Sequence, residues 1–331
     1  MKKIVSALLV LVLMMTALFS GTALAEKKKL SIVTTIFPIY DWVREIIGDQ
    51  DSAEITMLLD NGADLHSYQP TAADILKVST ADLFIYVGGE SDEWVEDVLA
   101  TAANPNLAAI SLVEALGDAI KTEELVEGME HEHEEGEDED EDGHEHHHDE
   151  EEEEADEHVW LSLRNAETLC SVITEELNKI DPAGAANYQA NLAAYSAKLS
   201  ALDKAYAEMV EGSQYKTVLF GDRFPFRYLT DDYGLSYFAA FSGCSAESEA
   251  SFQTIVFLAQ KVDELHLPAV LTIEHPKTRI AETVVSATQA KNAKILSMDS
   301  MQSITAQDVQ AGASYLSIME NNLNVLREAL N

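Results

Sequence analysis

Short apolar runs alternate with amphipathic helical patterns along most of the chain, and eight of these runs favour buried β-strands. The first four runs are Leu30–Phe37, Ala53–Leu59, Asp82–Val87 and Leu107–Leu112, and the second four are Thr217–Phe220, Leu235–Phe241, Pro268–Ile273 and Ala293–Met298. Helical patterns follow at 38–48, 70–79, 91–104 and 164–179, and again at 225–232, 249–265, 277–290 and 305–329. This alternation predicts an α/β fold of two lobes, each a parallel sheet of (β/α)4 type.

A long helix is predicted between the two groups of strands. After Pro182 the apolar residues recur at spacings of three and four, at Tyr188, Leu192, Tyr195, Leu199, Leu202, Tyr206 and Met209. This stripe predicts one helix of about 28 residues that ends near Gly212. A two-stranded coiled coil is the alternative. We expect the segment 182–212 to link an N-terminal lobe at 26–181 to a C-terminal lobe at 213–331.

The first 25 residues have the pattern of a secretory signal peptide. Lys2 and Lys3 precede an uncharged apolar run, and the small-residue site Ala23-Leu24-Ala25 predicts cleavage before Glu26. A retained membrane anchor is the alternative, but the run is short for a span of about 20 residues. A lipoprotein signal requires a cysteine, and Thr22 stands where one is expected. We therefore expect an exported protein that lies outside the cytoplasmic membrane.

Acidic residues dominate the charge of the chain, which has a formal net charge of −38. A surface of this sign repels nucleic acid and attracts cations, so nucleic-acid binding is excluded. The two cysteines, Cys170 and Cys244, do not have the spacing of a metal motif. The sequence leaves open whether they form a disulfide, because it does not define the distance between them in space.

The segment 130–157 concentrates this charge in an acidic, histidine-rich loop. It holds nineteen Asp and Glu residues and six of the ten histidines. So many like charges predict a solvated segment that has no packed core. Imidazoles among carboxylates form a loose site for divalent transition metals, above all zinc. The candidate loop ligands are His131, His133, His144, His146, His147 and His148.

Potential metal ligands also follow the predicted strands of both lobes. These residues are His66, His158, Asp222, His275 and Asp299. The carboxyl ends of parallel strands are where open α/β sheets bind ligands, so their shared placement predicts a site in the cleft between the lobes. Imidazole with carboxylate suits zinc or manganese. His266 lies at the end of a predicted helix instead, and we interpret it as a structural or surface residue.

Two motifs resemble those of a known family. The segment Gly62-Ala63-Asp64-Leu65-His66-Ser67-Tyr68-Gln69-Pro70-Thr71 resembles the G-x-D-P-H-x-Y-x-P-T signature of ZnuA-like metal receptors of ABC importers, and Glu157-His158-Val159-Trp160-Leu161-Ser162 resembles their D-P-H-V-W-L-S-P motif. An acidic, histidine-rich insertion before the second motif is typical of the zinc-specific branch. The resemblance implies two lobes joined by one long helix, with the metal held by His66 and His158.

The second lobe departs from the pattern of that family. The third ligand of the family opens a segment that matches Gly221–Leu235, where an alignment without gaps places Arg223, which cannot bind a cation, at the ligand position. One inserted residue places Asp222 there instead. The last family ligand matches Asp299. We therefore expect the metal ligands His66, His158, Asp222 and Asp299, with Glu274 and His275 as alternatives.

The resemblance implies a high-affinity zinc receptor that delivers Zn²⁺ to an ABC permease, and we expect it to be a monomer. A manganese receptor of the same fold is the first alternative, because two histidines and two carboxylates also accept manganese. A secreted zinc hydrolase is a second, but the sequence has no His-Glu-x-x-His motif and no recognisable nucleophile motif. We therefore do not expect an enzyme. A metal buffer or adhesin leaves the two histidine motifs unexplained.

Overall fold

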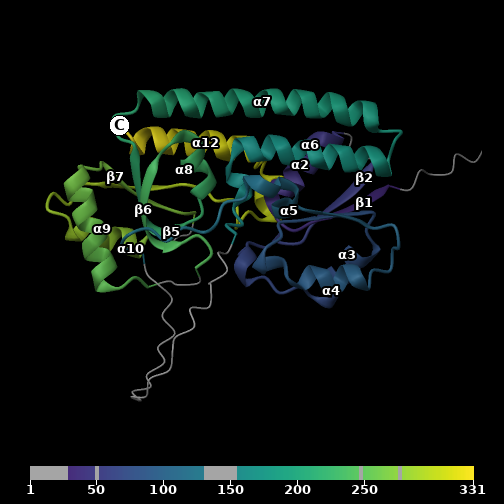
Figure 1. The fold of residues 1–331 in the computed structure, drawn as a ribbon, viewed down its shortest axis with the longest axis horizontal. Helices are drawn as coiled ribbons and strands as arrows, with labels where there is room; N and C mark the ends of the chain where they lie inside the picture. The colour runs from purple at the N-terminus through teal and green to yellow at the C-terminus, as the bar shows by residue number, and fades with distance from the viewer. Residues whose placement is uncertain (1–28, 49–51, 130–154, 246–248, 275–277) are drawn as a thin grey trace, which may run out of the picture.

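Two parallel four-stranded sheets form the framework of the protein (Figure 1). The structure is a computed structural model that describes residues 29–48, 52–129, 155–245, 249–274 and 278–331. The first sheet has the order β2-β1-β3-β4 and the second the order β6-β5-β7-β8. The first sheet consists of β1 (Leu30–Thr34), β2 (Ala53–Met57), β3 (Leu83–Tyr86) and β4 (Ala108–Ser111). The second sheet consists of β5 (Thr217–Phe224), β6 (Ser236–Ser242), β7 (Ala269–Thr272) and β8 (Lys294–Ser297). The predicted α/β fold with two parallel sheets is confirmed.

Helices follow the strands and cover the sheets. Those of the first half are α2 (Phe37–Ile47), α3 (Ala72–Thr80), α4 (Trp94–Ala100), α5 (Leu112–Leu116) and α6 (Leu163–Ile180). The second half has α8 (Arg227–Tyr233), α9 (Phe252–Leu265), α10 (Arg279–Ala287), α11 (Ala306–Gln310) and α12 (Tyr315–Ala329). The single helix expected at 305–329 is wrong, because the chain turns at Gly312, where φ is +101°, and restarts at the N-cap Ser314.

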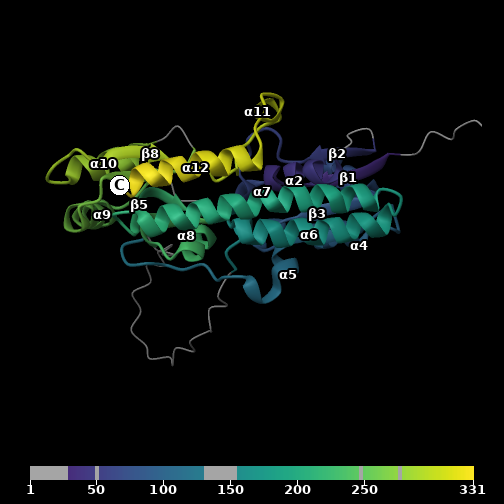
Figure 2. The ribbon, with the colours of Figure 1, turned by 90° about the horizontal axis from the view of Figure 1, so that it is seen from above.

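The helix α7 (Ala185–Gly212) has 28 residues and lies along the top of both sheets in Figure 1. Seen from above in Figure 2, it runs beside α6 and α12, and it packs against α2, α6 and α12. Its buried face includes Tyr188, Tyr195, Leu199, Leu202 and Tyr206, all members of the predicted apolar stripe. The stripe is therefore explained by packing within one chain rather than by a coiled coil.

The two sheets share one hydrophobic core that continues beneath α7. Trp160 is fully buried, and its indole N–H donates to the backbone oxygen of Ser300 at 2.8 Å. Tyr315, the first residue of α12, donates its hydroxyl to the backbone oxygen of Trp160 at 2.7 Å. Its ring packs edge-on against Trp42 of α2, with 5.3 Å between the centroids. These contacts tie the C-terminal helix to the first lobe and restrain movement between the sheets.

The start of α12 is also held by a buried carboxylate. Asp41 of α2 accepts the backbone N–H of Tyr315 at 2.8 Å. Burial raises the pKa of Asp41 to about 6, from the ordinary value of 3.8, although the Tyr315 N–H opposes the shift. The folded protein therefore binds a proton at Asp41 more tightly than the unfolded chain does. The stability that Asp41 contributes is present below pH 3.8 and is lost as the pH rises through about 6.

We expect Asp41→Asn to remove this pH dependence, because the amide oxygen still accepts from Tyr315 and carries no charge. A shift of two pKa units corresponds to about 3 kcal/mol. The unfolding free energy of the variant minus that of the wild type should rise by up to about 3 kcal/mol between acidic and neutral pH. Urea unfolding at a series of pH values measures this difference. A difference that is constant with pH would contradict the assignment.

Several sequence predictions fall on residues outside the described ranges. They are the signal peptide at 1–25, the loop histidines 131–148 and the alternative ligand His275. Within the described residues, none of the helices combines the length and the apolar character that a membrane crossing requires.

Candidate metal centre

His66 lies in a short 3-10 helix, Leu65–Ser67, that follows β2. The N-cap of this helix is Asp64, whose Oδ1 accepts the backbone N–H of His66 at 3.1 Å. The other oxygen, Oδ2, pairs with Nη2 of Arg223 at 2.6 Å. Arg223 belongs to β5, so this ion pair joins the two lobes beside His66. The Arg223 guanidinium is the largest cause that holds the pKa of Asp64 below its usual value, against the effect of burial.

His158 is fully buried and stands at the N-cap of a second 3-10 helix, Val159–Leu161. Its ring Nδ1 lies 3.0 Å from Oδ1 of Asp156, and the same oxygen accepts the backbone N–H of His158 at 2.8 Å. A carboxylate only accepts hydrogen bonds, so this network assigns the proton to Nδ1. The Nε2 lone pair of His158 is then free to bind a cation.

His66 is oriented by a comparable relay. Its Nδ1 lies 2.9 Å from Oγ of Ser91, and the hydroxyl of Ser91 donates to the carboxylate of Glu157. Nδ1 of His66 is therefore the donor, and Nε2 again carries the lone pair. Burial, and then the neighbouring His158, lower the pKa of His66 to about 3. The imidazole is neutral at ordinary pH, which is the form that binds metal.

The two Nε2 atoms face each other at 3.2 Å. Tetrahedral zinc with Zn–N bonds of about 2.0–2.1 Å requires about 3.3–3.4 Å between two nitrogen ligands. The observed separation is close to that value. The His158 imidazole is buried and that of His66 is partly buried, and each is held from Nδ1 by a hydrogen bond that leads to a carboxylate, which is the arrangement that metal-binding histidines usually have.

Cys244 is the third group at this position. Within the described residues, the cluster of potential ligands whose atoms all lie within 4.8 Å of one another comprises His66, His158 and Cys244. Cys244 is not among the ligands expected from the sequence, because it lies in a loop and has no metal-motif spacing. The available signal was its place just after β6, an end of a parallel strand like those of the other candidates.

The carboxylates expected from the second lobe are not part of that cluster. Asp222 lies within β5 rather than after it, and its oxygens accept the backbone N–H groups of Arg223 at 2.9 Å and Ile273 at 3.3 Å. Asp299 follows β8 as expected, and its Oδ1 accepts the N–H of Met301 at 2.8 Å. The part that both residues take in metal binding stays a prediction.

Asp299 is nevertheless an unusual carboxylate. Burial, and then the charge of Glu274, raise the pKa of Asp299 to about 7. Glu274 itself accepts the backbone N–H of Ser300 at 2.8 Å and its hydroxyl at 2.7 Å. Two carboxyl groups that repel each other attract a cation. Asp299 and Glu274 are therefore candidates for a carboxylate ligand from the second lobe.

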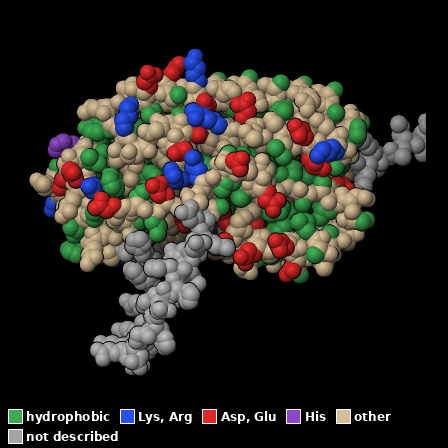
Figure 3. All heavy atoms as spheres, viewed as in Figure 1, with side chains coloured by type: hydrophobic (Ala, Val, Ile, Leu, Met, Phe, Trp, Pro, Cys, Tyr) green, Lys and Arg blue, Asp and Glu red, His purple; other side chains and the backbone are tan. Residues whose placement is uncertain are grey.

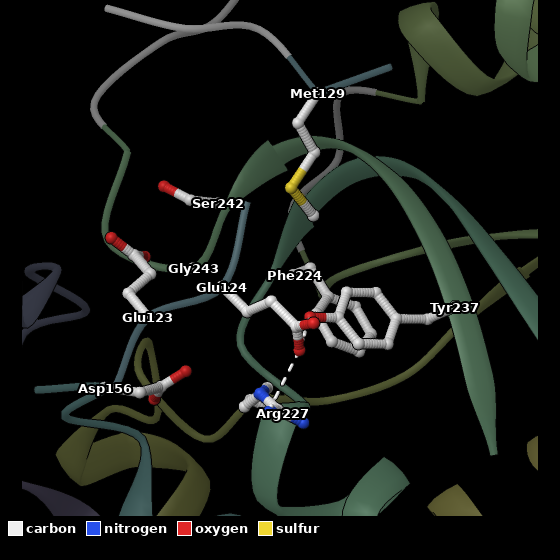
Figure 4. Close-up of a pocket in the computed structure, with 9 residues that line it drawn as sticks. All are labelled: Glu123, Glu124, Met129, Asp156, Phe224, Arg227, Tyr237, Ser242 and Gly243. Atoms are coloured by element: carbon white, nitrogen blue, oxygen red, sulfur yellow. Dashed lines mark hydrogen bonds and ion pairs between the residues drawn. The ribbon is translucent and has the colours of Figure 1, made fainter. Parts of the chain in front are cut away.

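A small hollow is lined by residues from both halves of the chain (Figure 4). Its lining includes Asp156, which orients His158, and Gly243, where an added Cβ atom would lie 2.9 Å from Cε1 of His158. In the close-up Glu124 points toward Arg227, and the two form an ion pair at 3.0 Å. Met129 also lines the hollow and is the last described residue before the acidic loop. Asp156 lies near the C-terminal end of that loop, so residues at both ends of the loop line the same hollow.

The cysteines do not form a disulfide: Cys170 and Cys244 are both free. Cys170 is buried in α6, and burial raises the pKa of its thiol. Burial also raises the pKa of the Cys244 thiol, and the nearby charge of Glu123 adds to the effect. Both thiols are therefore protonated in the metal-free protein at neutral pH.

Comparison with known proteins identifies the family. Residues 32–329 match the family described as ZnuA, the periplasmic component A of a zinc-uptake complex. The chain belongs to the ZnuA family. ZnuA relatives include the zinc-binding lipoprotein AdcA of Streptococcus pneumoniae serotype 4, which is 32% identical over 300 residues, or 91% of this chain and 56% of AdcA. The chain thus spans about half the length of the AdcA relatives.

A second ZnuA relative matches over nearly its full length. The high-affinity zinc uptake system protein ZnuA of Bacillus subtilis is 29% identical over 310 residues, which cover 94% of this chain and 90% of that protein. Among solved structures, the Zn(II)-bound ZnuA-like domain of Streptococcus pneumoniae AdcA has a TM-score of 0.70 and 28% identity, and the match covers 91% of this chain and 99% of that domain. The family predicted from the two histidine motifs is confirmed.

Proposed function

We propose that this protein is an extracytoplasmic receptor that binds one Zn²⁺ between its lobes and delivers it to an ABC permease. The observation that carries the proposal is the pair of facing Nε2 atoms of His66 and His158, 3.2 Å apart. Zinc is here the cargo that the protein carries. The relatives described as zinc-binding and zinc-uptake proteins support the same cargo.

The surface charge supports cation capture. Acidic side chains gather below the centre of the face shown in Figure 3, with few basic residues beside them. A negative surface raises the local concentration of cations and speeds their association. The acidic loop 130–157 contributes nineteen Asp and Glu residues to the negative charge, together with six histidines that are potential metal ligands. We propose that the loop holds further zinc weakly and passes it to the centre.

We propose that the protein binds and releases zinc as a monomer and does not catalyse a reaction. A zinc hydrolase keeps one open coordination position for water beside a general base. In this centre the carboxylates nearest the histidines, Asp156 and Glu157, are already engaged with His158 and Ser91. They orient ligands and are not placed to activate water.

Zinc titration against a competing chelator tests the proposal, with the protein that lacks residues 1–25. We expect one tight equivalent together with weaker equivalents. A variant that also lacks residues 130–154 should keep the tight equivalent and lose the weak ones. Zinc at about a thousand times its dissociation constant should stabilise the fold by about 4 kcal/mol and raise Tm by on the order of 10 °C. Loss of the tight equivalent in the loop deletion would show that the loop is the receptor.

A further inference from the structure

Cys244 brings a sulfur atom from the second lobe to two histidines of the first. The residue follows β6, whereas His66 follows β2 and His158 precedes α6. The three ligand atoms lie within 4.8 Å of one another. A metal receptor that holds its cargo between lobes requires at least one ligand from each lobe. Cys244 is the second-lobe residue that meets this condition in the described part of the chain.

The backbone around Cys244 is fixed in place. Its N–H donates to Oε1 of Glu123 at 3.0 Å, a contact that crosses between the lobes. A Cβ atom on the preceding residue, Gly243, would lie 2.9 Å from Cε1 of His158 and 3.0 Å from the backbone oxygen of Phe224. Only glycine lets the loop approach the imidazole so closely. The position of the thiol beside His158 is therefore a product of the local fold.

We propose that the Cys244 thiolate is the second-lobe ligand of the zinc ion, in place of the third family ligand, whose position Arg223 occupies in an alignment without gaps. The inference rests on the proposed function. On binding, a Zn–S bond of about 2.3 Å forms and the thiol proton leaves to solvent. Tetrahedral geometry places sulfur about 3.5 Å from each nitrogen ligand, so closure by about 1.3 Å at most from the 4.8 Å limit completes the set.

A thiolate also changes which metal the centre prefers. Sulfur is a soft ligand that selects zinc, whereas manganese and calcium prefer oxygen. Two neutral imidazoles and one thiolate leave a charge of +1 on the zinc complex. A single carboxylate in the fourth position cancels that charge, which is the part predicted for Asp299. Cys244 thus determines the choice between zinc and manganese that two histidines and two carboxylates leave open.

Cobalt(II) spectroscopy of the protein without residues 1–25 tests the sulfur ligand directly. A cobalt–thiolate bond gives a near-ultraviolet charge-transfer band that histidine and carboxylate ligands do not give, so metal on the acidic loop does not interfere. We expect the band in the wild type and in the matched control Cys170→Ala, and its loss in Cys244→Ser. A band that persists in Cys244→Ser, or that is absent from a wild type with bound cobalt, would overturn the proposal.

Metal affinity provides the second readout. For Cys244→Ser we expect the zinc dissociation constant to rise at least about tenfold, and the preference for zinc over manganese to fall at least about tenfold. Cys170→Ala should remain within about twofold of the wild type. Circular dichroism of the metal-free variants checks that each is folded.

The outcomes separate this inference from the proposed function. A wild type that binds no zinc tightly contradicts both. Tight binding by the wild type with unchanged affinity and selectivity in Cys244→Ser contradicts the thiolate ligand alone. In the Cys170→Ala protein Cys244 is the remaining cysteine, so a thiol reagent labels it without any change at Cys244 itself. The effect of zinc on this labelling also tests whether the thiol is a ligand. Zinc should slow that labelling at least about tenfold, and an unchanged rate would count against the ligand.

Discussion

We expect His158→Ala to weaken zinc binding at least about a hundredfold, or about 2.7 kcal/mol. His158 is fully buried and held by Asp156, so its Nε2 is already oriented before the ion arrives. Loss of a partner that only orients a metal ligand typically weakens affinity 10- to 100-fold, and loss of the ligand itself should exceed that range. His66→Ala should have a comparable effect, because its Nε2 lies 3.2 Å from that of His158.

Chelator competition in the variant that lacks residues 130–154 measures both affinities without the loop histidines. His266→Asn is the matched control: His266 is exposed, has a φ of +53°, and asparagine tolerates that conformation. Its zinc affinity should equal that of the parent protein. Unchanged affinity in His66→Ala and His158→Ala together would place the ion elsewhere. Thermal unfolding without metal shows whether each variant keeps its fold.

The strands could be predicted because buried parallel strands are short continuous runs of β-branched and apolar residues. Leu83–Tyr86 and Ala269–Thr272 are examples that the pattern located to within one or two residues. β5 was predicted to end at Phe220 but continues to Phe224, through a shift in its pairing with β6 between Phe220 and Arg223. The added residues of β5 are defined by their pairing with the backbone of β6, which the local sequence pattern does not reveal. The bulge places Asp222 inside the strand.

Gly221 shows the same dependence on tertiary contacts. A Cβ atom there would lie 2.6 Å from Cα of Ala281, so α10 packs directly onto the β5 backbone. The helix expected at 305–329 failed for a local reason that the sequence did contain. Gly312 followed two residues later by the N-cap Ser314 is a helix end followed by a helix start.

His66 and His158 were identifiable because each lies in a motif whose neighbours orient it. Asp64 caps the helix of His66, and Asp156 binds His158 two residues away. Cys244 has no such neighbours in sequence. It reaches the histidines only because β6 of the second lobe ends opposite the first lobe, and that placement depends on packing between sheets. Ligands contributed by the packing of two lobes are therefore harder to predict than ligands contributed by one motif.

Trp160 should be the most sensitive position of the shared core. It is fully buried, donates to Ser300 across the lobes, and packs against His158 with 5.3 Å between the ring centroids. We expect Trp160→Ala to lower the unfolding free energy by about 3–5 kcal/mol, because it leaves a cavity where the lobes meet. Urea unfolding of the metal-free protein measures this loss. Phe252→Ala, at a side chain 81% exposed, is the control and should change stability by at most about 0.5 kcal/mol.

Trp160→Phe separates packing from the hydrogen bond. The phenyl ring fills most of the space but leaves the Ser300 oxygen without its donor, so the loss should be about 1–3 kcal/mol. Zinc affinity should fall in Trp160→Ala and less in Trp160→Phe, because the ring beside His158 is absent from the first and retained in the second. Equal losses of stability in the two variants would show that the hydrogen bond to Ser300, and not the ring, holds the lobes together. Full zinc affinity in Trp160→Ala would show that Asp156 alone suffices to orient His158.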